Sequence, residues 1–232
     1  MDIDIVDALL WYVVFILSVT VHEAAHAWVA KKGGDLTAYA GGQVSLNPLP
    51  HIKREPLGMV VFPIVSSLLI GWPFGYASTP YSPEWAHKSP RKASWMAAAG
   101  PGANLFLLLL SVAAIKAGIL SGIFLQPDSV GLRHIIDPGS GGLEGVAVFV
   151  SMMFTLNLIL LILNLLPFPP FDGSGVVALF LSDEAARKYR RVISNPMFGF
   201  LGLFLAWQVF SPVFQVVFLR VINLLYWGSG YA

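Results

Sequence analysis

The sequence contains no cysteine, which excludes disulfide bonds and thiolate metal ligands. Any bound metal must therefore be held by His, Asp or Glu side chains or by carbonyl oxygens. Charge is also scarce, because Asp, Glu, Lys and Arg make up only 12% of the residues, against about 25% in soluble domains. With 56% hydrophobic residues, the composition indicates an integral membrane protein.

The small net charge of +1 bears on the choice of partner. Basic residues form short clusters in the polar loops and do not line up in one stripe, so we expect no nucleic acid as a partner. At the N-terminus, Met1–Asp7 is acidic where a signal peptide would be basic, and no small-residue cleavage site follows. The first apolar run is therefore expected to stay in the mature protein.

Four apolar runs each reach the roughly 20 residues that span ~30 Å of hydrocarbon. We predict membrane-spanning helices at about 8–30, 93–120, 143–168 and 197–227. The last run is too long for one upright span, and Pro212 near its middle predicts a kink or a break. Every polar stretch is too short for a second domain, so we expect one all-α polytopic membrane domain over residues 1–232.

A fifth apolar stretch, 57–71, lies between Pro56 and Pro73 and is short for a full span, so it either crosses the membrane or dips in and returns. Loops rich in Lys and Arg stay cytoplasmic, and such residues flank the stretch on both sides. The charge rule therefore favours the re-entrant interpretation, which puts the N-terminus outside. The cytoplasmic basic residues would then be Lys31, Lys32, Lys53, Arg54, Lys88, Arg91, Lys92, Arg187, Lys188, Arg190 and Arg191.

The first apolar run contains the motif His22-Glu23-Ala24-Ala25-His26. Two histidines four residues apart lie on one face of a helix and can hold one metal ion, while the Glu between them can act as a base. Ionisable groups in a membrane helix cost roughly 2.5 to 3.5 kcal/mol each on insertion scales and mark functional sites. In a helix that begins near Ala8, His22 lies roughly 21 Å below the outer boundary, on the cytoplasmic side of the bilayer centre. The motif predicts a zinc hydrolase centre within the membrane.

A carboxylate follows the third apolar run, in the segment Asn164–Gly173. Three prolines stop the helix there and Gly173 permits a tight turn, so Asp172 can be held rigidly at membrane depth. A catalytic zinc typically takes three protein ligands and leaves a fourth position for water. His22, His26 and Asp172 complete that count, and we predict one zinc ion per chain.

Taken together, three motifs resemble the site-2 protease family of intramembrane zinc metalloproteases over nearly the whole chain. They are the His22–His26 motif in a first membrane helix, Gly100-Pro101-Gly102-Ala103-Asn104 opening another, and Asn164–Gly173 closing a third. Residues 41–52 and 74–77 also resemble the small subgroup of that family built from little more than the catalytic core.

The resemblance implies a role for each matching residue. His22, His26 and Asp172 would be the zinc ligands, Glu23 the base that activates the metal-bound water, and Asn164 the residue that polarises the scissile carbonyl or holds the oxyanion. The chain departs from the family pattern at Lys53, where an acidic residue and a proline often follow His-Ile, and at Phe171, where an aliphatic residue is usual. Neither departure touches a ligand.

We therefore expect an intramembrane zinc metalloendopeptidase of a prokaryotic cell membrane, with its active site toward the cytoplasm. Its substrate would be a transmembrane protein or peptide, cut in or near the bilayer. A helical substrate hides its carbonyl groups and must be unwound before attack. The segments Gly41–Leu46 and Gly75–Tyr81 have the composition of short strands, so we predict cytoplasmic β-strands whose edges hold the substrate by β-augmentation.

Two alternatives stay open from the sequence. One is a membrane metallopeptidase of a different family that cuts cytoplasm-exposed segments and uses a downstream Glu as third ligand, although Glu84, Glu144 and Glu184 lack a matching helical motif. The other is a non-catalytic metal-binding membrane scaffold or transporter subunit, although inverted repeats are not evident. The roles of His51, Asn104 and Asn157, a regulatory membrane partner and the oligomeric state are likewise open.

Overall fold

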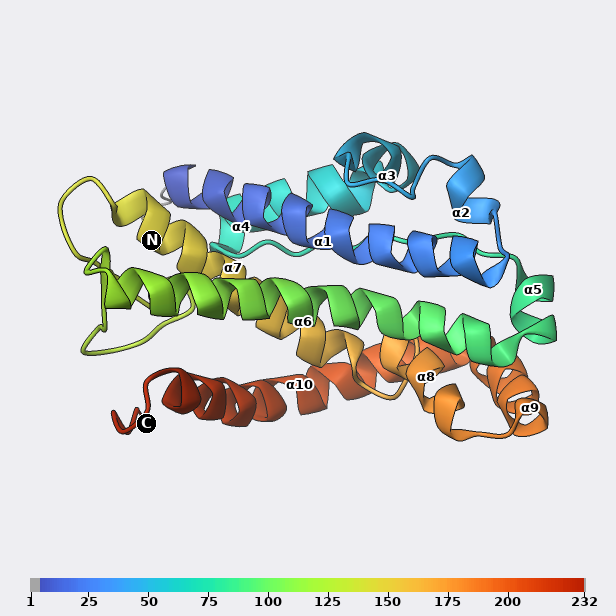
Figure 1. Ribbon diagram of the computed structural model, residues 1–232. Helices are drawn as coiled ribbons and strands as arrows, with labels where there is room; N and C mark the ends of the chain where they lie inside the picture. The colour runs from blue at the N-terminus through green and yellow to red at the C-terminus, as the bar shows by residue number, and fades with distance from the viewer. Residues whose placement is uncertain (1–4, 232) are drawn as a thin grey trace.

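The computed structural model describes residues 5–231, so the first four residues of the acidic N-terminal segment lie outside the described part. In that part, four helices are long and apolar enough to cross a membrane: α1 (Ile5–Gly33), α6 (Pro90–Leu120), α7 (Glu144–Asn164) and α10 (Pro196–Leu225). They run along the length of the molecule (Figure 1). The prediction of four such helices is confirmed, although α7 ends at Asn164, short of residue 168.

Prolines and caps explain where the long helices begin and end. Pro90 and Pro196 each occupy the first turn of a helix, where the missing N–H costs nothing, and the Asn195 side chain caps α10 by accepting from Met197 N at 3.0 Å. After α7, Pro167 disfavours helical geometry at the residue before it. The chain is therefore forced out of the helix at the point where the predicted third ligand follows.

Short helices connect the spans. They are α2 (Thr37–Ala40), α3 (Pro48–Arg54), the π-helix η1 (Leu57–Val61), α4 (Phe62–Ile70), α5 (Pro83–Lys88), α8 (Asp172–Val177), the 3-10 helix η2 (Ala178–Phe180) and α9 (Asp183–Ile193). In Figure 1, α2, α5 and α9 lie at the end of the bundle where α1 ends.

The short apolar stretch folds as one arm of a hairpin. η1 and α4 run back along α1, the chain turns at Gly71 with φ of 70°, and the next segment returns beside the arm (Figure 1). Phe74 N donates to Ser66 Oγ at 2.7 Å, and Tyr76 N donates to Gly58 O at 3.1 Å. The chain thus enters and leaves at the same end of α1, which is the path that a re-entrant segment requires.

The prediction of strands at 41–46 and 75–81 is wrong. In residues 5–231 the paired strands are β1 (Phe124–Leu125) and β2 (Asp137–Pro138), which pair antiparallel in the loop between α6 and α7. Gly42 turns the first predicted segment with φ of 74°, and Pro80 lacks the N–H that a ladder needs. Both segments are held by isolated hydrogen bonds, such as Gln43 Nε2 to Ser78 O at 3.1 Å.

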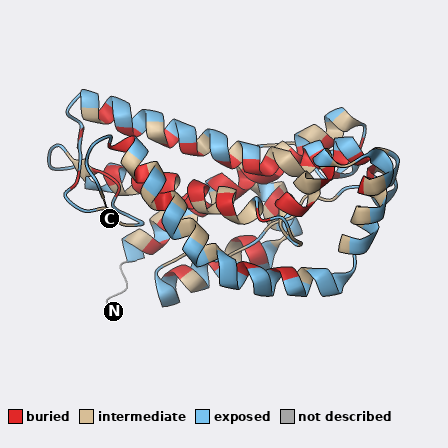
Figure 2. Ribbon diagram, turned by 90° about the horizontal axis from the view of Figure 1, so that it is seen from below, coloured by how far each residue is buried: buried red, intermediate tan, exposed pale blue. Residues whose placement is uncertain are grey.

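Helix α10 runs through Pro212 without interruption, so of the two predicted outcomes the break is wrong and the kink stays a prediction. A single proline removes one N–H donor, and the remaining backbone hydrogen bonds of a long helix can compensate for that loss. α10 is also the most exposed span, with 11% of its apolar window buried against 50% for α7. Exposed residues cover the outer faces of the spans while buried ones face inward (Figure 2), which suits contact with lipid.

The interior has two apolar clusters. One joins α6, α7 and α10 around Ile115, Phe154 and Ile222, and the other joins α1, η1 and α7 around Trp11 and Met59. Buried polar side chains accompany them on the facing sides of α1, α6 and α7. This polar part of the interior holds the predicted site.

Candidate metal centre

Three side chains from two distant parts of the chain converge beside α6. His22 and His26, one turn apart on α1, have their Nε2 atoms 3.0 Å apart. Asp172 Oδ2, from the first residue of α8, lies 3.1 Å from each of them. Both histidines are buried and Asp172 is half-buried. The structure thus brings together the three residues that the sequence predicted as ligands.

Gly100 lets α6 approach these three side chains. A Cβ at this position would overlap His26 Nε2 and would lie 2.5 Å from His22 Nε2. The glycine lies well inside α6, so the expectation that residues 100–104 open a helix is wrong, and it is Gly100 that allows the close approach. Without a Cβ, the space between α6 and the two ring nitrogens is kept.

The donor set and its spacing fit a catalytic zinc ion. Tetrahedral zinc with bonds of about 2.0 to 2.1 Å places its ligand atoms about 3.3 Å from each other, close to the observed 3.0 and 3.1 Å. Two imidazoles and one carboxylate are also the ligand types of known three-ligand catalytic zinc sites. The three residues could therefore hold zinc and leave one position for water.

Both histidines are oriented through their other ring nitrogen. His26 Nδ1 lies 2.7 Å from the backbone oxygen of Met96 on α6. His22 Nδ1 lies 2.6 Å from Oδ1 of Asn104, one turn beyond Gly100. Metal-binding histidines usually have such a partner, which fixes the plane of the ring.

Asp172 is positioned by a tight turn. Gly173 packs so closely that a Cβ would overlap Leu166 O, and Ser174 Oγ donates to Phe171 O at 2.8 Å. On the outer side, a Cβ at Gly202 of α10 would overlap Pro169 O, so α10 braces the same turn. The turn that carries Asp172 is thus held by close packing at Gly173 on one side and at Gly202 on the other.

Glu23 is buried and its carboxylate is held by the returning segment of the hairpin. Thr79 Oγ1 lies 2.6 Å from Glu23 Oε2, to which it can donate. The segment is fixed to the end of α1 by Asp35, whose Oδ2 accepts from Ser82 N at 2.7 Å. Burial raises the pKa of Asp35, but hydrogen bonds from Thr37 and Ser82 outweigh it and leave that pKa below its usual value.

The two asparagines of α7 differ in their surroundings. Asn164, the residue predicted to hold the oxyanion, ends the helix half-buried, and its side chain makes no hydrogen bond to the residues between 5 and 231. Asn157 is fully buried, and its Oδ1 accepts from Asn104 Nδ2 at 3.0 Å. Asn157 is therefore the one that is connected to the metal-binding side chains.

A family comparison decides what kind of protein carries this site. The family model described as Peptidase family M50 matches residues 10–206. The chain belongs to peptidase family M50. The resemblance to site-2 proteases is thereby confirmed, and with it a zinc-dependent peptidase and an integral membrane protein.

Curated relatives of this M50 peptidase carry related names. YwhC of Bacillus subtilis (strain 168), named as a candidate zinc metalloprotease, is 32% identical over 83% of this chain and 78% of its own length. Rip2 of Mycolicibacterium smegmatis, similarly named, is 28% identical over 75% of this chain and 58% of its own length. Rip2 of Mycobacterium tuberculosis (strain H37Rv) is 27% identical over 88% and 70%. No solved structure matches the chain.

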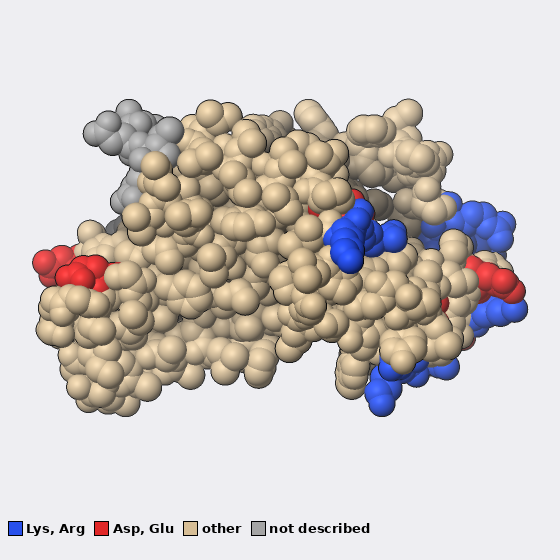
Figure 3. All heavy atoms as spheres, turned by 90° about the horizontal axis from the view of Figure 1, so that it is seen from above, with Lys and Arg blue, Asp and Glu red and all other residues tan. Residues whose placement is uncertain are grey.

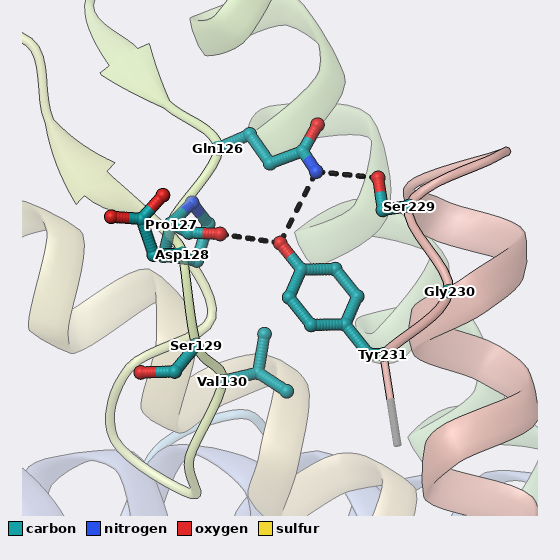
Figure 4. A pocket seen from close by; sticks show the side chains of 8 residues that line it. All are labelled: Gln126, Pro127, Asp128, Ser129, Val130, Ser229, Gly230 and Tyr231. Carbon is teal, nitrogen blue, oxygen red and sulfur yellow. Dashed lines mark hydrogen bonds between the residues drawn. The ribbon is translucent and has the colours of Figure 1, made fainter.

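Two pockets of the M50 peptidase differ in how close they lie to the His22–His26 motif. The smaller, of about 320 Å³, is lined by Ala24, Ala25, Trp28, Val44, Ser45 and Leu46 and therefore flanks the His22–His26 motif. The larger, of about 510 Å³, lies at the opposite end of the bundle, where Tyr231 donates to Pro127 O at 2.5 Å (Figure 4). Neither pocket is lined by a predicted site residue, so we assign the chemistry to the metal centre.

Proposed function

We propose that this M50 peptidase is an intramembrane zinc metalloendopeptidase, which hydrolyses peptide bonds in or near transmembrane segments of other proteins. One observation carries the proposal. His22, His26 and Asp172 place three ligand atoms 3.0 to 3.1 Å apart in a helix bundle whose spans are long and apolar enough to cross a membrane. Together they would hold one zinc ion per chain.

The neighbouring side chains supply the proton transfers and the charge stabilisation. When bound, zinc would make water a stronger acid and polarise the scissile carbonyl as a Lewis acid. Glu23 accepts a proton and delivers it to the leaving amine, and the hydrogen bond from Thr79 restrains its carboxylate. Asn164 donates its free amide N–H to the developing oxyanion, a type of contact worth about 2.7 to 4 kcal/mol where it has been removed.

The proposed orientation places the site toward the cytoplasm and the N-terminus outside. On the face shown in Figure 3, Lys and Arg side chains lie toward one end of the molecule, the end that carries α5 in Figure 1. Loops rich in Lys and Arg stay in the cytoplasm. Since His26 lies nearer that end of α1 than Ile5 does, the charge rule supports a cytoplasmic side for the metal centre.

The alternative with a glutamate as third ligand loses its support. Within residues 5–231, the group of side chains suited to a metal ion consists of His22, His26 and Asp172 and includes no glutamate. The family membership likewise favours an enzyme over a scaffold or a transporter subunit.

The proposal is tested with purified protein and a membrane-spanning peptide substrate. Wild-type protein should contain about one zinc ion, and Glu23→Gln should keep the metal yet lower cleavage by about 10²- to 10⁴-fold, the usual contribution of an acid–base group. Glu84→Gln on α5 is the matched control, because that glutamate pairs with Lys88 at the surface. Retained cleavage in Glu23→Gln, or a wild-type protein that binds no zinc, would refute the assignment.

A further inference from the structure

A line of buried hydrogen bonds joins the three inner helices to the metal centre. Asn104 on α6 and Asn157 on α7 are both fully buried. His22 Nδ1 lies 2.6 Å from Asn104 Oδ1, and Asn104 Nδ2 donates to Asn157 Oδ1 at 3.0 Å. Asn157 Nδ2 in turn donates to the backbone oxygen of Met153 at 2.8 Å and to Ser18 Oγ at 3.0 Å. In each of the two asparagines, both the amide oxygen and the NH₂ group therefore take part in a hydrogen bond.

The direction of this line is fixed by its last member. A backbone carbonyl only accepts hydrogen bonds, so Asn157 must turn its NH₂ group toward Met153 O. Its oxygen then faces Asn104, which must present its own NH₂ group. The oxygen of Asn104 therefore faces His22, and a contact of 2.6 Å to this acceptor requires a proton on His22 Nδ1.

A neutral imidazole carries one ring proton, so a proton on Nδ1 leaves the lone pair of Nε2 free for a metal ion. We propose that the Met153 carbonyl, acting through Asn157 and Asn104, sets the tautomer of His22 that can bind zinc. Both asparagines are then positioning residues of the metal centre. This inference rests on His22 being a zinc ligand, as proposed above.

The second histidine shows the same principle without an intermediary. His26 Nδ1 faces the Met96 carbonyl directly at 2.7 Å, so its tautomer is fixed by the backbone of α6. His22 Nδ1 instead faces a side chain, that of Asn104, whose amide can flip and exchange its oxygen for its NH₂ group. If Asn104 turned its NH₂ group toward His22, Nδ1 would become the acceptor and Nε2 would carry the proton. Asn157 prevents this flip, because its oxygen would then face the oxygen of Asn104.

The affinity of the full-length protein for zinc, measured in detergent by competition with a chelator, tests the inference without using activity. Asn104→Leu and Asn157→Leu should bind zinc about 10- to 100-fold more weakly, the usual effect of losing a partner of a metal ligand. Ser18→Ala should stay close to wild type, because it removes a bond of 3.0 Å from the same network but leaves the Met153 carbonyl to set the direction. Ser111→Ala, elsewhere on α6, is the outer control.

A rescue variant separates tautomer control from simple packing. In the Asn157→Leu background, Asn104→Asp should restore most of the zinc affinity, because a carboxylate has no N–H to present to His22 and always accepts from its Nδ1. Asn157→Ala, which introduces no larger side chain, gives the same readout if the leucine variant does not fold. Wild-type affinity in the Asn157 variants, or no restoration by Asn104→Asp, would overturn the inference.

The same assay includes His22→Ala. Loss of zinc in His22→Ala together with wild-type affinity in both asparagine variants would reject only the tautomer inference. Zinc retained in His22→Ala would reject the proposed metal centre itself. The two failures are therefore distinguishable.

Discussion

Gly100 shows how far the site depends on a single missing methyl group. The space between α6 and the ring nitrogens of His22 and His26 exists because this residue has no Cβ. The motif from His22 to His26 could be found in the sequence because its spacing is local. Gly100 stood out in the sequence as part of a motif that resembles the family's, but its contact with the two histidines could not be predicted, because they lie on a different helix.

Gly100→Ala should abolish tight zinc binding, because the new Cβ would overlap His26 Nε2 and contact His22 Nε2 at 2.5 Å. Gly102→Ala is the matched control, since a Cβ at that position meets nothing within 4 Å. Zinc content after purification is the measurement. Equal zinc in the two variants would show that α6 does not enclose the metal at Gly100.

Thr79→Val should lower kcat about tenfold to a hundredfold and leave zinc content unchanged, because Glu23 loses a hydrogen bond to a charged group worth about 1.5 to 3 kcal/mol. Thr79→Ser retains the hydroxyl and should recover most of the rate. The check is steady-state cleavage with zinc determined on the same samples. A valine variant as active as the serine variant would remove Thr79 from the mechanism.

At the scale of elements, the four long helices could be predicted because the length of an apolar run alone indicates a membrane-spanning helix. The path of residues 57–71 followed from the basic residues on both flanks, and the hairpin geometry agrees with it. The strand predictions were wrong because Gly42 turns the chain and Pro80 lacks a backbone N–H, and composition alone did not take these effects into account. The contact from Thr79 to Glu23 could not be foreseen, because it depends on how the returning segment packs.

Asp35 ties that returning segment to α1, and its lowered pKa predicts a pH dependence. The folded-state pKa lies below the unfolded value of about 3.9, so the contribution to stability is present above that pH and is lost as the pH falls through the folded pKa. Asp35→Asn should therefore be less stable than wild type near neutral pH, and the difference should shrink in acid. Thermal unfolding in detergent from pH 3 to 7 measures it. A constant difference across this range would contradict the assigned hydrogen bonds.

For the whole molecule, the proposed membrane location of the chemistry rests on where the metal centre lies in the bundle. The three ligand atoms lie in a bundle of four long apolar helices. Exposed residues cover the outside of these helices (Figure 2), and the basic side chains seen in Figure 3 lie toward the end of the bundle where α1 ends. Composition predicted the class of protein, and the motifs predicted which ligands meet. The network through Asn104 and Asn157 required the three-dimensional packing of α1, α6 and α7.

The most direct test is to reconstitute the protein in lipid vesicles with a single-span substrate and to determine the new termini of the products. We predict a cut in or next to the apolar segment that is lost in Asp172→Ala. Cleavage confined to soluble regions far from the span, or cleavage that persists in Asp172→Ala, would contradict the proposed intramembrane zinc site.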